Sequence, residues 1–252
     1  FTSQSGETKD VLTAEEVARQ KGVTTLSLVN VPGSTLAKVT RFSLPLACGY
    51  EVSVPATKSY TNQAIAFLYL ALKMSHLPAA NLVRLPDLLQ QTLDSTAPQM
   101  VLLAEELVEW NEFYCLGYGA TYPVALEAAL KLKEVSYAHC EGLVSTEFKH
   151  GPLSAVSPGY PVLFLAGPHD TSVMVSGINE VTTRYGRAIV FGEAERRLKA
   201  NASSLITLPV SGALLNPILA VLPLQLLAYQ LCLARGCDPD QPRNVSKTLM
   251  VD

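Results

Sequence analysis

Apolar residues along the chain repeat with the period of a helix in some segments and form short continuous runs in others. In residues 10–21, Val11, Ala14, Val17 and Ala18 fall on one helical face, and Gly22 follows as a stop signal. Further helical patterns lie at 60–74, 86–93, 99–110, 123–137, 172–185 and 217–234. Runs rich in strand-forming residues predict strands at 24–29, 41–46, 112–116, 162–166, 188–191 and 204–208.

The predicted strands and helices alternate, which indicates an α/β fold with a parallel sheet covered by helices on both faces. The alternation starts a second time near residue 112. We therefore predict two α/β units of similar kind, at 1–96 and 97–236, followed by a tail at 237–252. Compared with the second unit, the first is expected to lack its opening strand and helix.

Composition and charge exclude several classes of protein. The 252 residues are 48% hydrophobic and 16% charged, which suits a packed core and excludes a disordered chain. The net charge is −3 without a basic block, so we expect neither nucleic-acid nor anionic-membrane binding. The apolar stretch Ile218–Leu233 is interrupted by Pro223, Gln225 and Gln230, so no membrane span is expected.

The five cysteines are scattered and show no spacing typical of metal ligands or disulfide frameworks. Reduced thiols in a cytoplasmic protein are the simplest interpretation. We expect no metal site, and no motif calls for a cofactor.

The first string with possible chemistry is SQSGET, residues 3–8, directly before the first predicted helix. Hydroxyl groups and the free N–H groups of a helix start together make a cradle for a phosphate. Ser5 or Thr8 acting as an ordinary N-cap explains the same residues without a ligand, and spacing alone favours that alternative.

Two further places carry acid–base candidates. Glu127, Lys131 and Glu134 are spaced to share one face of the helix at 123–137, either as a solvent-exposed ion pair or as a carboxylate base beside a lysine. His150 lies among charged residues in EFKHGPL, where Gly-Pro stops any helix, and is a candidate acid or base. In the tail, Lys247 is either solvated or a Schiff-base amine.

Taken in order, these strings resemble the isomerase part of the glucosamine-6-phosphate synthase family, which is built from two sugar-isomerase (SIS) domains. The matching strings are SQSGET (3–8), EVSVPATKSYTNQ (51–63), LGYGATYPVALEAALKLKEVSYAHCEG (116–142), EFKHGPL (147–153) and LPLQLLAYQLCLARGCDPDQPRNVSKTLMVD (222–252). The resemblance implies two flavodoxin-like, three-layer αβα domains, an isomerase acting on fructose-6-phosphate or glucosamine-6-phosphate, and a homodimer with a shared active site.

The resemblance also implies roles for individual residues. Ser3, Gln4, Ser5 and Thr8 would bind the sugar phosphate, together with the segment that holds Val54 and Ala56. Glu134 would move a proton between C1 and C2, and His150 would open the sugar ring across the dimer interface. Lys247 would form a Schiff base with the C2 ketone, and the supporting residues would be Lys131, Glu127 and Arg243.

The sequence departs from the family pattern at two places. Ala56 stands where the family usually has Ser, which removes one hydroxyl from the site, and Gly117-Tyr118-Gly119 replaces the usual Gly-Arg-Gly. The residues leave two other functions open. One is a deaminase or deglycase that releases an amine from glucosamine-6-phosphate or fructosamine-6-phosphate. The other is a non-catalytic phosphosugar sensor, although a sensor would not need Glu134, His150 and Lys247 together.

Overall fold

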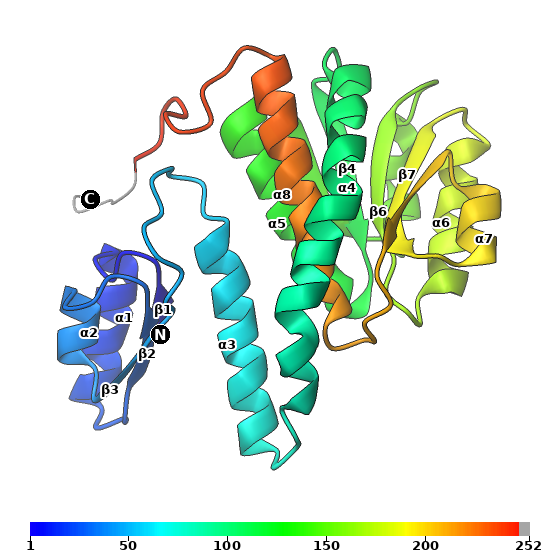
Figure 1. The fold of residues 1–252 in the computed structure, drawn as a ribbon. Coiled ribbons are helices and arrows are strands. Elements are labelled where there is room, and N and C mark those ends of the chain that lie inside the picture. Colours follow the sequence, from blue (N-terminus) through cyan, green and yellow to red (C-terminus); the bar gives the residue numbers. More distant parts are fainter. Residues whose placement is uncertain (247–252) are drawn as a thin grey trace. The chain divides into compact units, whose positions relative to one another are not determined.

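The computed structural model describes residues 1–246, apart from the side chains at positions 80 and 81. The chain forms two compact units, one made of residues 1–79 with the tail from Asp240 and the other of residues 80–239. In both units parallel strands alternate with helices (Figure 1). The predicted α/β class with parallel sheets is therefore confirmed.

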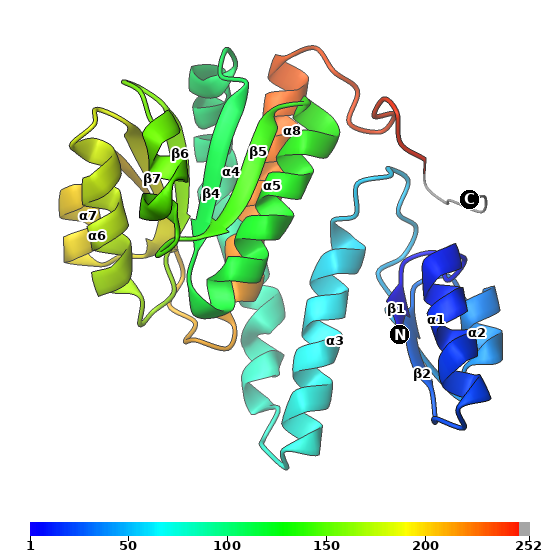
Figure 2. The same cartoon turned by 180° about the vertical axis from the view of Figure 1, so that it is seen from behind.

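The first unit is a three-stranded parallel sheet in the order β1-β2-β3. Because the strands follow one another in a single direction, right-handed crossovers place α1 and α2 on the same face, where they contact each other (Figure 2). The buried Leu28, Val29 and Leu36 lie in this layer. The elements are β1 (Thr2–Ser3), α1 (Lys9–Gln20), β2 (Leu26–Val29), α2 (Thr35–Val39), β3 (Phe42–Pro45) and α3 (Lys58–Met74).

The second unit is a five-stranded parallel sheet in the order β5-β4-β6-β7-β8. Its strands are β4 (Glu112–Gly117), β5 (His139–Val144), β6 (Pro161–Leu165), β7 (Arg187–Glu193) and β8 (Ser204–Leu208). Its longer helices are α4 (Leu85–Leu107), α5 (Tyr122–Ser136), α6 (Thr171–Thr182), α7 (Arg196–Asn201) and α8 (Asn216–Ala234). Short 3-10 helices are η1 (Ala80–Arg84), η2 (Gly119–Thr121), η3 (Phe148–His150) and η4 (Pro152–Ala155).

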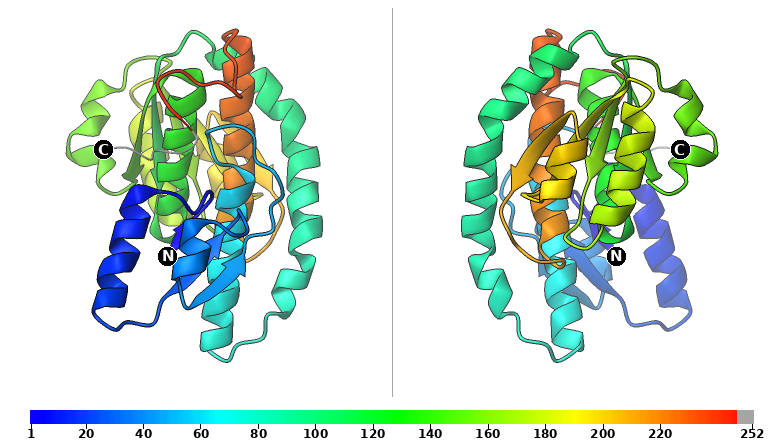
Figure 3. Two further views of the ribbon diagram at one scale, coloured as in Figure 1. Left: turned by 90° about the vertical axis from the view of Figure 1, so that its left-hand side faces the viewer. Right: turned by 90° about the vertical axis from the view of Figure 1, so that its right-hand side faces the viewer.

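Two helical layers enclose the second sheet. Helices α4, α5 and α8 pack together on one face, and α6 and α7 contact each other on the other face (Figures 1 and 3). The connection from β5 to β6 lies on the α6 face, because Phe148 of η3 shares a buried cluster with Met174 and Ile178 of α6. This placement follows from right-handed crossovers, since β4–α5–β5 and β5–β6 step in opposite directions along the sheet.

Helix α4 corrects one prediction from the sequence. The segments 86–93 and 99–110, expected as two helices, form the single helix α4 with Pro98 in its interior. Proline costs an intrahelical hydrogen bond, but α4 packs along α8 and buries residues on both sides of Pro98, including Thr96 and Met100. The expected domain boundary between residues 96 and 97 therefore falls inside a helix, and the chain divides between residues 79 and 80 instead.

Helix α8 contains the apolar stretch for which the sequence predicted no membrane span. Asn216–Ala234 is long and apolar enough to cross a membrane by length and composition alone, in spite of Pro223. The helix is mostly buried within the second unit, where it packs against α4 and α5. The core helix of a soluble protein meets the same criterion. Just after it, the Arg235 guanidinium donates hydrogen bonds to carbonyl groups of Val108, Trp110 and Ser136, near the C-terminal ends of α4 and α5.

Candidate functional site

The SQSGET string forms a tight loop between β1 and α1. The backbone N–H of Gly6 donates to the Ser3 hydroxyl at 2.9 Å, and the N–H of Glu7 donates to the Ser5 hydroxyl at 3.1 Å. The hydroxyls of Ser3 and Thr8 are 3.2 Å apart. These bonds shape the loop at the carboxyl end of β1, where parallel α/β sheets bind ligands.

The ordinary N-cap alternative for this loop is not supported. Thr8 is the N-cap residue of α1, yet within the described part of the chain its side chain makes no capping hydrogen bond. The Ser5 hydroxyl accepts from the loop N–H of Glu7 and not from the first turn of the helix. The start of α1 is therefore not capped by the side chain of Thr8, and a helix start without such a cap is a place where anions bind.

Gly6 is required where it stands. Its φ of +70° is left-handed, and a Cβ atom built there would lie 2.2 Å from the Ser34 hydroxyl oxygen. The neighbouring Glu7 accepts a hydrogen bond of 2.8 Å from the backbone N–H of Thr35, which lowers the pKa of this carboxyl. The loop is thereby tied to the start of α2.

A hollow of about 910 Å³ opens beside this loop within the first unit. It is lined by Gln4 and Ser5 of the loop, by Asn30 after β2, and by Glu51 among other residues. Val54 and Ala56, expected at the sugar, follow this lining in the segment before α3 and are half-buried. The Asn30 side chain bonds the backbone of Cys48 and Gly49 and so fixes the lining between β3 and α3.

On α5, the side chains of Glu127, Lys131 and Glu134 meet. The Lys131 Nζ donates a 2.5 Å hydrogen bond to Glu134 Oε2 and lies 3.5 Å from Glu127 Oε1. The Lys131 and Glu127 side chains are 5% and 10% exposed, so this is not the solvent-exposed ion pair of the simpler interpretation. Burial raises the pKa of Glu127 to about 7 despite the attraction of Lys131.

The remaining predicted residues are placed differently. His150 ends η3 and is exposed, and η3 contacts α6, on the face of the sheet opposite α5. Arg243 is exposed in the tail, and Lys247 lies outside the described residues. Sequence reasoning missed Glu7 and Glu51, whose carboxylates fix the loops of the first unit. Both residues belong to strings that match the family, SQSGET for Glu7 and EVSVPATKSYTNQ for Glu51, and this position was the signal that could have identified them.

The second unit has its own loops at the carboxyl ends of β4 and β6, where the strand order reverses. A small hollow of about 70 Å³ lies there, and its lining includes Gly167 and Asp170. Its loop 166–171 does not repeat the hydroxyl cluster of SQSGET: the Asp170 carboxylate itself accepts the Gly167 N–H at 3.2 Å. No cluster of three or more His, Cys, Asp or Glu side chains suited to a metal ion occurs in residues 1–246.

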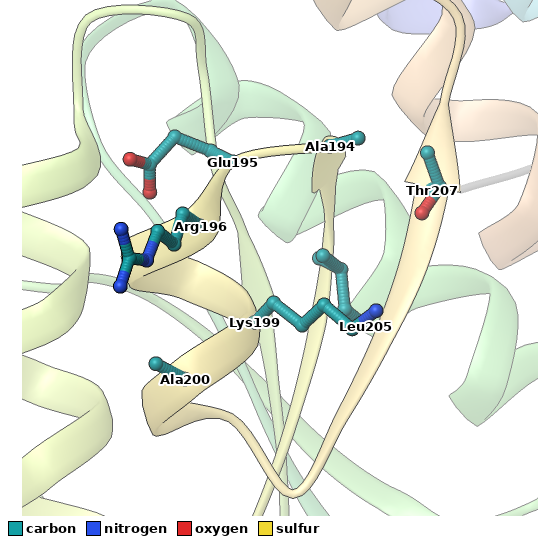
Figure 4. Close-up of a pocket in the computed structure, with 7 residues that line it drawn as sticks. All are labelled: Ala194, Glu195, Arg196, Lys199, Ala200, Leu205 and Thr207. Carbon is teal, nitrogen blue, oxygen red and sulfur yellow. The ribbon is translucent and has the colours of Figure 1, made fainter.

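Another hollow, of about 530 Å³, lies between α7 and β8. Figure 4 shows the Lys199 side chain extending from α7 toward Leu205, with Glu195 and Arg196 at the start of the helix. The Glu195 carboxylate accepts the backbone N–H of Leu198 and caps this helix of six residues. The lining of this hollow contains none of the candidate site residues predicted from the sequence.

A hydroxyl-rich loop at the end of a parallel strand, opening on a hollow, defines an α/β domain suited to binding a phosphorylated ligand. The chain belongs to the SIS domain family, whose model matches residues 1–73 and 106–235. It is 40% identical over 257 residues to a glutamine–fructose-6-phosphate aminotransferase (isomerizing) of Aquifex aeolicus, covering 99% of this chain and 43% of that protein. The chain thus spans less than half the length of this curated relative.

Solved structures show the same fold. The C-terminal domain of glucosamine-fructose-6-phosphate aminotransferase from Francisella tularensis superimposes with a TM-score of 0.85 at 29% identity, over 96% of this chain and 72% of that one. A glucosamine-6-phosphate deaminase from Thermotoga maritima superimposes with a TM-score of 0.80 at 24% identity, over 98% of this chain and 73% of that one. The second likeness concerns the fold alone.

Proposed function

We propose that this chain carries out the aldose–ketose isomerisation of a hexose 6-phosphate and acts on fructose-6-phosphate. The product would be glucose-6-phosphate when no amine is supplied, and glucosamine-6-phosphate when ammonia first condenses with the C2 ketone and releases water. The observation that carries the proposal is the buried Lys131 hydrogen-bonded to Glu134. It occurs in a chain 40% identical to an isomerizing aminotransferase over 99% of its length. Each stretch matched by the family model is proposed to be one SIS-type domain.

The phosphate is assigned to the loop of Ser3, Gln4, Ser5 and Thr8. Hydroxyl groups and the start of α1 supply hydrogen-bond donors and a positive dipole end without a cationic side chain. The hollow beside the loop leaves room for a hexose next to the segment of Val54 and Ala56. Ala56 cannot supply the hydroxyl of the usual family serine, so the remaining contacts must come from neighbouring backbone and side chains.

Glu134 is assigned as the base that moves the proton. In the open-chain ketose, its carboxylate takes a proton from C1, which gives an enediol, and returns the proton to C2, which gives the aldose. Lys131 holds the carboxylate in place through its hydrogen bond and balances its charge. Glu127 holds the other side of the Lys131 ammonium.

A shared site in a homodimer is proposed for His150. Glu134 belongs to α5 on one face of the second sheet, whereas η3 with His150 packs on the α6 face. Because Glu134 and His150 of one chain lie on opposite faces of the sheet, we propose that the site of Glu134 is completed by the His150 of a second copy of the chain. Arg243 is proposed to support substrate binding and Lys247 to form the Schiff base, the roles that the family resemblance implies. The five free cysteines agree with a cytoplasmic setting.

The test is to incubate the purified chain with fructose-6-phosphate in deuterium oxide. We expect glucose-6-phosphate to form and solvent deuterium to enter the sugar at the position that exchanges its proton. In parallel, glucosamine-6-phosphate is supplied and ammonia is assayed. Release of ammonia from glucosamine-6-phosphate, without conversion of fructose-6-phosphate to glucose-6-phosphate, would identify a deaminase. Tight binding of a sugar phosphate without either reaction would identify a sensor.

A further inference from the structure

A buried carboxylate closes a loop at the hollow of the first unit. Glu51 is 6% exposed, and its Oε1 accepts the backbone N–H groups of Thr57 at 2.8 Å and Ser59 at 3.4 Å. Its Oε2 accepts the Ser59 hydroxyl at 2.5 Å, and Oε1 also accepts the Thr57 hydroxyl at 3.4 Å. One side chain thereby joins the two ends of the segment 52–56.

The Glu51 carboxylate also accepts hydrogen bonds from backbone N–H groups at the N-terminus of α3. The first N–H groups of a helix have no partner within the helix, and the helix dipole favours a negative charge there. Thr57, the N-cap residue, makes no capping hydrogen bond with its own side chain in the described chain, so Glu51 supplies the acceptor from outside. The Lys58 ammonium adds a 2.6 Å hydrogen bond to the carbonyl of Tyr50.

Glu51 lines the same hollow as Gln4 and Ser5 of the hydroxyl-rich loop. We propose that Glu51 is a positioning residue for sugar recognition, because it holds residues 52–56 in the conformation that receives the sugar portion of a hexose phosphate. The inference rests on the proposed function, since that function places a sugar beside Val54 and Ala56. It assigns to Glu51 no contact with the reacting atoms.

Loss of the bonds of Glu51 should affect the binding of the sugar portion of the ligand and not the binding of its phosphate. A segment that is already ordered loses little conformational entropy when a ligand binds, whereas a loosened one must be ordered at the expense of affinity. Inorganic phosphate needs the loop of residues 3–8 and does not need the segment 52–56. Loosening the segment should therefore weaken the binding of a hexose phosphate and leave that of inorganic phosphate unchanged.

The experiment compares two ligands on the full chain by calorimetry, inorganic phosphate and glucosamine-6-phosphate. In Glu51→Gln we expect the affinity for glucosamine-6-phosphate to fall about tenfold, the size of a lost charge-assisted hydrogen bond. Ser59→Ala, which keeps the charge and removes one donor, should show a smaller loss in the same direction. Glu16→Gln, at an exposed glutamate of α1, is the matched control and should bind both ligands like the wild type.

Three results would overturn the inference. One is an unchanged affinity for glucosamine-6-phosphate in folded Glu51→Gln, or in Ser59→Ala if Glu51→Gln does not fold. Another is an equal loss for both ligands, which would indicate general damage to the first unit. If the wild-type chain binds neither ligand, the proposed function itself fails, and this result is distinct because it precedes any variant.

Discussion

The Nζ atom of Lys131 donates a hydrogen bond of 2.5 Å to Oε2 of Glu134, one helical turn further along α5. The same ammonium lies 3.5 Å from Glu127 on the preceding turn, and among residues 1–246 that Glu127 Oε1 has no hydrogen-bond partner. One buried cation therefore faces two carboxylates and is bonded more closely to one of them. This asymmetry underlies the separate roles proposed for the two glutamates.

Replacing Glu134 by glutamine should abolish proton transfer between C1 and C2 while leaving sugar-phosphate binding nearly intact. The amide keeps the shape of the carboxylate and removes its basicity, and loss of a general base lowers a rate by about 10²–10⁴-fold. The measurement is deuterium exchange from solvent into fructose-6-phosphate, with Glu105→Gln on the exposed face of α4 as control. Exchange at the wild-type rate in Glu134→Gln would remove this residue from the mechanism.

Glu127 predicts a pH dependence of stability. Burial raises its pKa from 4.5 to about 7 in the folded chain, so the folded state holds this proton more tightly than the unfolded state does. The resulting stabilisation is fully present below pH 4.5 and is lost as the pH rises to about 7. It amounts to about 3 kcal/mol between these limits.

Urea unfolding, followed by the fluorescence of the single tryptophan, Trp110 in the second unit, measures this effect. Between pH 4.5 and 7 the wild type should lose stability relative to Glu127→Gln, and above pH 7 the difference should stay constant. Glu105→Gln should run parallel to the wild type. A constant difference between wild type and Glu127→Gln across the whole range would contradict the raised pKa.

Gly6→Ala and Gly22→Ala form a matched pair in the first unit. Both glycines have φ near +70°, so either substitution should cost about 1–2 kcal/mol from backbone strain. At Gly22 nothing lies within 4 Å of an added Cβ, whereas at Gly6 the Cβ would meet the Ser34 hydroxyl at 2.2 Å. We expect Gly6→Ala alone to lose binding of inorganic phosphate in calorimetric titrations. Equal phosphate binding by both variants would mean that the loop does not form the phosphate site.

Local patterns predicted those parts of the fold that depend on local sequence. The helix expected at 123–137 is α5, at Tyr122–Ser136, because its apolar period and Pro123 act within the helix itself. Strand β5 was not predicted, since His139 and Glu141 are polar and the strand forms by pairing with β4. The continuity of α4 through Pro98 likewise depends on packing against α8.

The same distinction applies to the candidate site. Helical spacing was enough to place Glu127, Lys131 and Glu134 side by side, because all three lie on one regular helix. Spacing did not reveal that Lys131 is buried and that both glutamates are largely shielded from solvent, which depends on the packing of the second unit. The role of Glu51 could not be predicted, because its bonds to Thr57 and Ser59 arise from a loop that closes on itself.

Lys247 lies outside the described residues, and its role as a Schiff-base amine stays a prediction. Its amine should condense with the open-chain C2 ketone of fructose-6-phosphate, release water and form an imine that borohydride reduces to a stable secondary amine. Peptide mass mapping after reduction should find the sugar adduct on Lys247 and, in Lys247→Arg, no adduct at that position. If adducts are absent from the wild type, or spread equally over Lys9 and Lys199, then Lys247 has no covalent role and the ketone is activated in another way.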